Sequence, residues 1–126
     1  MFLKILRILY GAALITFGLN GFFGFLPIPE KQGFALEFMT TLHHAGYVFP
    51  AVASIMLLSG TLLLLNRATL LGLFLMLPVS FNIFFFHLLH DRAALVVAWL
   101  LFALNMFHIF RHKQTLKLLL KGENIQ

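Results

Sequence analysis

Apolar residues occur in four long runs along the chain, separated by short polar breaks. Each run is close to the roughly 20 residues that an α-helix needs to cross the hydrocarbon core of a membrane. The expected helices span residues 5–25, 47–65, 70–89 and 93–110. The pattern therefore predicts an all-α membrane protein, a four-transmembrane-helix bundle formed by a single domain over residues 1–126.

The first run follows Lys4 and Arg7 and resembles a signal peptide, but it offers no small residues that would form a cleavage site. We therefore expect it to be retained as the first spanning helix. Pro27 and Pro29 end that helix, because proline lacks an amide donor and disfavours helical geometry in the residue before it.

Residues 30–44 are the most polar part of the first half of the chain. Phe34, Phe38 and Leu42 recur every four positions, with polar residues between them. This spacing predicts a short amphipathic helix at the outer membrane interface, between the first and second spans. A loop with partial helicity is the alternative.

The later connections are short. Residues 66–69 allow only an antiparallel hairpin between the second and third spans, and we expect Thr69 to cap the third. Pro78 cannot donate to a carbonyl, so it is expected to kink the third span one turn below Asn82. Residues 111–126 are basic with interleaved leucines, which predicts a cytoplasmic tail that continues as a helix along the membrane surface.

The composition agrees with a membrane location and restricts the types of reaction that the protein could catalyse. Hydrophobic residues make up 61% of the 126 residues and charged residues 10%, too few polar groups to cover a soluble domain. The absence of cysteine removes disulfides, thiolate metal sites and thiol redox chemistry. No nucleophile with a base, glycine-rich phosphate loop or pair of catalytic carboxylates can be assembled, so a self-contained hydrolase or kinase is not expected.

The formal net charge of +5 would suggest a nucleic-acid partner in a soluble chain. In a membrane protein it is informative about orientation, because lysine and arginine concentrate on the cytoplasmic side. Seven of these residues fall on one side of the four spans and only Lys31 and Arg92 fall on the other. Both termini are therefore expected in the cytoplasm, and no nucleic-acid partner is expected. The seven are Lys4, Arg7, Arg67, Arg111, Lys113, Lys117 and Lys121.

Several short segments within residues 1–110 resemble the short, four-helix form of the DoxX family. They are Gly18-Leu19-Asn20, Phe22-Phe23-Gly24-Phe25-Leu26-Pro27, Gly46-Tyr47, residues 62–67, Asn82-Ile83, Phe86-His87 and Asn105. The resemblance implies a small, multi-pass subunit of the bacterial inner (plasma) membrane that is associated with redox complexes. Some relatives are membrane subunits of a thiosulfate:quinone oxidoreductase. Many relatives carry a glutamate in the second helix, where this chain offers only Ser54.

Polar side chains within the predicted spans mark a candidate ligand site. A rise of 1.5 Å per residue places Asn20 roughly 22 Å and Asn82 roughly 18 Å from the inner helix ends, with Ser54 and Trp99 at a similar depth. Together with Phe86 and His87, these residues offer the apolar slot, aromatic wall and donors that a quinone needs. Alternatively, the asparagines only hydrogen-bond between helices and the aromatic residues only pack.

Histidines near the outer ends of the spans raise the question of a metal. The candidate ligands are His43, His44, His87, His90 and Asp91. Histidines that reach toward lipid headgroups are the alternative and the expected one, because no dense metal-binding signature is present. A bis-histidine haem is not expected, since His87 and His108 lie near opposite membrane surfaces.

Two functional hypotheses follow. The first is a redox-associated subunit that binds a quinone or a similar apolar small molecule in the outer half of the bundle. Any oxidoreductase activity would then need a partner membrane or redox subunit. The second is a non-enzymatic lipid-binding or scaffold protein that uses the same groove.

Overall fold

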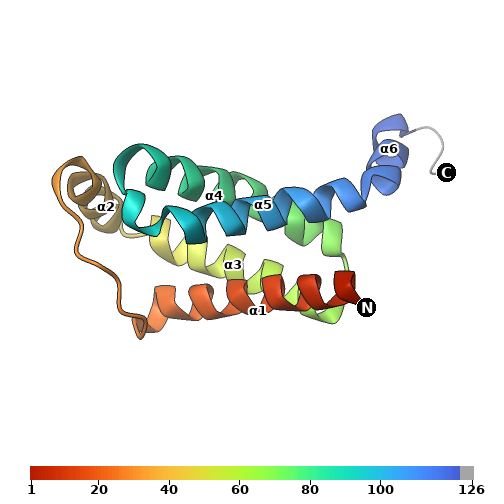
Figure 1. The fold of residues 1–126 in the computed structure, drawn as a ribbon, viewed down its shortest axis with the longest axis horizontal. Coiled ribbons are helices and arrows are strands. Elements are labelled where there is room, and N and C mark those ends of the chain that lie inside the picture. The colour runs from red at the N-terminus through yellow and green to blue at the C-terminus, as the bar shows by residue number, and fades with distance from the viewer. Residues whose placement is uncertain (123–126) are drawn as a thin grey trace.

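The computed structural model describes residues 1–122, and within this part of the chain the regular structure is entirely helical (Figure 1). Its helices are α1 (Phe2–Phe23), α2 (Gly33–Ala45), α3 (Val48–Leu65), α4 (Thr69–His90), the short 3-10 helix η1 (Arg92–Ala94), α5 (Leu95–Arg111) and α6 (Lys113–Lys121). Among the described residues, α1, α3, α4 and the continuous segment Arg92–Arg111 are long and apolar enough to cross a membrane. The protein is thus a multi-pass membrane protein with a four-helix bundle, as the apolar pattern predicts.

The spanning helices form a ring of antiparallel neighbours. α1 packs against α3, α3 against α4 and α4 against α5, and α5 also touches α1. The N-terminus, the α3–α4 turn and α6 lie at one end of the bundle, and α2 lies at the other (Figure 1). We call these the terminal end and the α2 end.

Glycines allow α1 and α3 to pack closely. A Cβ atom on Gly60 of α3 would lie 2.7 Å from the carbonyl oxygen of Gly11 in α1. A Cβ atom on Gly18 of α1 would lie 3.0 Å from the carbonyl oxygen of Ala53 in α3. Only small residues let helix backbones approach this closely in a membrane, so these glycines set the spacing of the pair.

Left-handed residues end the helices at the turns. Gly24 (φ 61°) ends α1, and Asn66 (φ 54°) and Ala68 (φ 49°) form the α3–α4 turn. The prediction that Thr69 caps the third span is wrong. The tight turn is complete at Ala68, so Thr69 is already the first helical residue, and its hydroxyl donates to Oδ1 of Asn66 at 3.3 Å.

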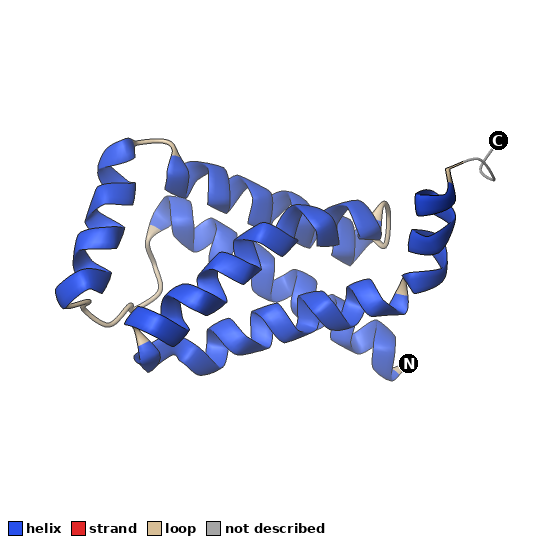
Figure 2. Cartoon of the chain, turned by 90° about the horizontal axis from the view of Figure 1, so that it is seen from above, coloured by secondary structure: helices blue, strands red, loops and turns tan. Residues whose placement is uncertain are grey.

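The amphipathic segment between the first two spans is the helix α2, as one of the two sequence interpretations expected. It lies across the end of the bundle rather than along it (Figure 2). It contacts α3 and α4 but not α1. Phe34 contacts the ring of His90 and Phe38 stacks on Phe86, so the aromatic residues of α2 rest on the end of α4.

The basic tail forms a separate helix, because the chain turns at His112 before α6 begins. α6 packs only against α5 among the described elements and points away from the bundle axis (Figure 1). Leu118, Leu119 and Leu120 are exposed. The part of the predicted tail after Gly122 lies outside the described residues.

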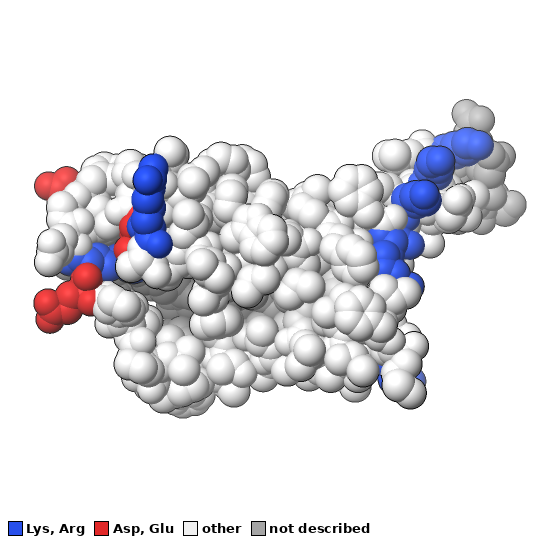
Figure 3. Space-filling view, in the orientation of Figure 1, with Lys and Arg blue, Asp and Glu red and all other residues white. Residues whose placement is uncertain are grey.

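Charged side chains gather at the two ends of the bundle and leave a broad uncharged band between them (Figure 3). Large apolar residues are exposed along this band. An apolar band between charged ends is the surface that a lipid bilayer requires. Examples from the exposed set are Leu9, Leu58, Leu71, Phe81, Val96 and Leu100.

Candidate functional site

The six residues predicted to bind a ligand do not form a single cluster. Ser54, Asn82 and Trp99 are exposed and belong to three different helices, α3, α4 and α5. The Ser54 hydroxyl donates to the carbonyl of Pro50 at 2.7 Å, and the Asn82 amide donates to that of Pro78 at 2.8 Å. The depth of a residue can be read from its position in a helix, but depth does not say which way the side chain faces.

Asn20 does line a cavity, at the α2 end between α1, α2 and the start of α3. The cavity has a volume of about 580 Å³. This is within the range of small-molecule sites, which is roughly 300–1,000 Å³. Its lining residues are Phe17, Asn20, Gly21, Ile28, Met39, His43, Gly46, Phe49, Pro50, Val52, Ala53 and Met56. We call it the α2-end cavity.

Local folding explains why this cavity exists. The Asn20 side-chain oxygen accepts a hydrogen bond from the amide of Leu26 at 2.7 Å, and the Asn20 backbone carbonyl accepts one from Gly24 at 2.8 Å. These bonds turn the chain away from the axis of α1. The following segment then crosses to α2, which packs on α3 and α4 and so leaves space beside α1.

Two polar side chains enter an otherwise apolar lining. The Asn20 side-chain nitrogen makes no hydrogen bond within residues 1–122, and neither does the His43 imidazole on the α2 wall. The His43 ring lies 6.3 Å from the ring of Phe49. The cavity thus presents two polar groups and nearby aromatic surface to an apolar molecule.

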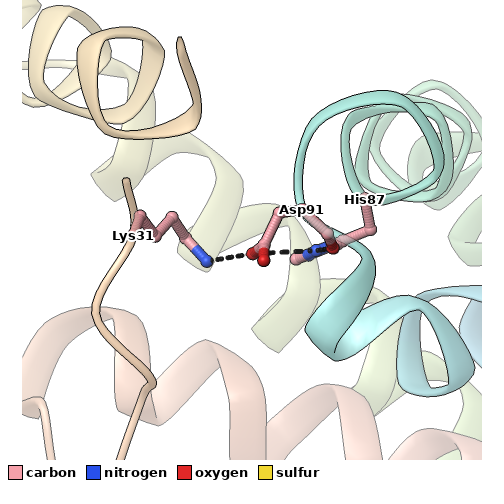
Figure 4. A network of polar contacts seen from close by, with 3 residues as sticks. All are labelled: Lys31, His87 and Asp91. Carbon is pink, nitrogen blue, oxygen red and sulfur yellow. Dashed lines mark hydrogen bonds and ion pairs between the residues drawn. The ribbon is translucent and has the colours of Figure 1, made fainter. Parts of the chain in front are cut away.

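His87, another predicted ligand residue, belongs instead to an ion network at the α4–α5 turn (Figure 4). The Lys31 ammonium lies 2.5 Å from Oδ2 of Asp91. Nδ1 of His87 lies 3.3 Å from the same oxygen and 3.1 Å from the Asp91 backbone carbonyl, to which it donates. Lys31 also lies 5.8 Å from the centre of the Phe86 ring. The network ties the segment between α1 and α2 to the end of α4.

Charge around Asp91 alters its titration. The hydrogen bond from Lys31 holds the pKa of the Asp91 carboxyl below its usual value, and it outweighs partial burial, which acts in the opposite direction. The charges of Lys31 and His87 add to the lowering of this pKa. Asp91 is therefore an anion at neutral pH and can hold Lys31 in place.

The five candidate metal ligands take part in separate interactions. His87 and Asp91 meet in the ion network, His90 packs against Phe34, and His43 lines the α2-end cavity. The rings of His43 and His44 lie 6.4 Å apart. Within residues 1–122, no three histidine, aspartate or glutamate side chains gather as a metal site would require.

The structure also contains a buried polar cluster that the site prediction did not include. Tyr10, Asn105 and His108 are almost completely buried in the half of the bundle nearer the terminal end. The rings of Tyr10 and His108 stack at 5.8 Å, and the Asn105 amide lies beside the Tyr10 hydroxyl. Asn105 also donates to the carbonyl of Leu73 at 3.1 Å. The cluster joins α1, α4 and α5.

Helical spacing is the signal that could have found this cluster. Asn105 and His108 are three residues apart, so they share a face of α5. Leu101 occupies the same face one turn earlier and is also buried. Tyr10 neighbours Gly11 and lies four residues before Leu14, on the face of α1 that packs inward.

The comparisons with known proteins add no family to this description: no family model, no curated protein and no solved structure matches the chain. The resemblance to the DoxX family therefore stays a prediction from short sequence segments.

Proposed function

We propose that the protein binds a quinone, or a similarly apolar molecule that carries a carbonyl oxygen, in the α2-end cavity. The observation that carries this proposal is the cavity itself, which is largely apolar and has two polar side chains on different walls. Ligand pockets commonly combine an apolar lining with a few placed polar groups.

The polar groups suit a carbonyl ligand. The Asn20 amide nitrogen is a donor, and the imidazole of His43 offers a second donor from the α2 wall. Phe17 and Phe49 provide aromatic surface for a ring. A molecule of this kind would approach from the membrane beside α1, where α2 makes no contact with that helix.

A redox role extends the same proposal. The cysteine-free chain has no thiol to carry electrons, and in this proposal a partner subunit supplies them. The protein would act as the quinone-binding membrane subunit of such a complex, in line with the resemblance to the DoxX family. The partner would supply the redox centre.

Direct titration of the detergent-purified full chain with a short-chain quinone tests the binding step. We expect His43→Leu to weaken binding by about two- to tenfold, the usual effect of losing one hydrogen bond. Met39→Trp should weaken it further by filling the cavity. His44→Leu is the matched control, because His44 is the next residue of α2 and does not line the cavity. Equal weakening by His43→Leu and His44→Leu would contradict the proposal.

A non-enzymatic lipid-binding role is the second candidate, and the strongly apolar lining favours it. The side-chain oxygen of Asn20 is already engaged by Leu26, so much of the cavity is suited to an acyl chain. Mass spectrometry of the molecules that co-purify separates the two functions. Lipid in the cavity, with no quinone binding, would replace the first proposal by the second.

A further inference from the structure

A second cavity lies at the terminal end, on the opposite side of the membrane from the α2-end cavity. It has a volume of about 440 Å³ and lies among the start of α1, the α3–α4 turn and the α5–α6 junction. Its lining residues are Leu3, Lys4, Arg7, Asn66, His108, Arg111 and His112. We call it the basic cavity.

The charge around this cavity has one sign. Lys4, Arg7 and Arg111 line it, and no carboxylate does. The acidic residues of the described chain are Glu30, Glu37 and Asp91, and all three lie at the α2 end. Three cations that no carboxylate among residues 1–122 neutralises favour an anion in the space between them.

A buried histidine supplies an independent reason to expect a ligand. His108 is 1% exposed, and its Nδ1 atom donates to the carbonyl of Leu104 at 2.7 Å. Its Nε2 atom is buried and has no hydrogen-bond partner within residues 1–122. Buried polar atoms nearly always have a partner. Because Nδ1 carries the donated proton, Nε2 is an acceptor, and the partner it lacks is a donor such as a water molecule or a hydroxyl group of a lipid headgroup.

Helix ends of both kinds lie near the cavity: the N-termini of α1 and α6 attract an anion, and the C-terminus of α5, whose last turn lines the cavity, opposes this attraction. α1 and α6 both begin here, and neither has a side-chain cap on its first amide groups. Uncapped helix N-termini attract anions through free N–H groups and the helix dipole. The opposing end of α3 is covered, because the Arg7 guanidinium donates to the carbonyls of Leu63 and Leu64.

We propose that the basic cavity binds a phosphate group, and that its natural source is the headgroup of an anionic lipid. The cavity lies where four spanning helices end, at the depth of lipid headgroups, and basic pockets at this level are suited to such lipids. The exposed leucines of α6 would rest on the same membrane surface and hold His112 beside the headgroup.

Native mass spectrometry of the delipidated full chain, titrated with phosphatidylglycerol, tests this proposal. Arg111→Gln and Lys4→Gln should each weaken binding by about fivefold, which corresponds to the contribution of one basic residue near an anionic surface. Arg67→Gln and Lys113→Gln remove the same charge at the same end, from residues that do not line the cavity. These two controls should leave binding unchanged.

The outcomes distinguish a lipid headgroup, a free phosphate ion and a non-specific attraction of anions to positive charge. Phosphatidylglycerol binding that phosphatidylcholine cannot replace supports a lipid headgroup. Competition by inorganic phosphate at similar concentration supports the phosphate site but assigns it to a free anion. Equal losses in Arg67→Gln and Arg111→Gln, or no bound phosphate compound at all, would overturn the proposal.

Discussion

At the scale of single residues, the glycines at the contact between α1 and α3 determine how closely these two helices pack. Gly11 and Gly60 face each other across the α1–α3 contact, where a methyl group on Gly60 would meet a backbone oxygen at 2.7 Å. A backbone atom cannot move aside as a flexible side chain can. The spacing of this helix pair is therefore fixed by residues that sequence patterns mark only as small.

We expect Gly60→Ala to destabilise the protein by about 1–3 kcal/mol, the typical cost of overpacking. Gly72→Ala is the matched control, because a Cβ atom there would meet its nearest neighbours at 3.3 to 3.4 Å. Thermal unfolding in detergent measures both. If Gly72→Ala were as damaging as Gly60→Ala, the close approach of α1 and α3 would not be the reason.

Predictions for single residues were limited because the sequence does not show whether a side chain faces the lipid or the core of the bundle. Asn82 was expected to line a cavity, yet it is exposed and its amide donates to the carbonyl of Pro78 in the same helix. Tyr10 was not among the predicted site residues, yet its side chain is fully buried. Hydrophobic periodicity is weak in a helix that is apolar on all sides, so it does not show which face of the helix contacts lipid and which face contacts the core.

At the scale of elements, the sequence was most informative where hydrophobic length alone decides the structure. All four spans occur within a few residues of their predicted bounds, since crossing a membrane needs a set number of apolar residues. The placement of α2 across the bundle depends on tertiary contacts, such as Phe38 on Phe86, that no local pattern encodes. For that reason the α2-end cavity, which depends on the position of α2, could not be predicted, although Asn20, one of the candidate ligand residues, lies in its lining.

The Lys31–Asp91 pair should stabilise the attachment of the α1–α2 segment in a pH-dependent way. The pKa of Asp91 is lowered in the folded protein, so its contribution is complete above the unfolded pKa of about 4 and is lost as the pH falls through the lower folded value. Above that range, Asp91→Asn should cost at most about 1 kcal/mol, the usual upper value for an ion pair at the protein surface.

Thermal unfolding of wild type and Asp91→Asn between neutral and strongly acidic pH measures this effect. The difference between the two proteins should shrink as acid protonates Asp91. Glu37→Gln, which removes an exposed carboxylate at the same end, should show no such convergence. A difference that persisted at the lowest pH would argue that Asp91 acts through packing and not through its charge.

At the scale of the whole molecule, charge is distributed unequally between the two ends. The terminal end carries Lys4, Arg7, Arg67 and the basic residues from Arg111 onward, whereas the described acidic residues lie at the α2 end. The four candidate spans among residues 1–122 place the start of α1 and the helix α6 on one side of the membrane. The excess of lysine and arginine then predicts that this side is the cytoplasm.

The lack of cysteine makes this orientation directly measurable, because a single introduced cysteine is the sole thiol in the chain. Gln32 at the α2 end and Gln114 in α6 are both exposed, so each accepts a cysteine without disturbing the core. A membrane-impermeant maleimide added on the outer side of the membrane that holds the protein should label Gln32→Cys at once. It should label Gln114→Cys only after that membrane is permeabilised. The reverse pattern would place the basic cavity on the outer surface, where cytoplasmic anionic lipids could not reach it.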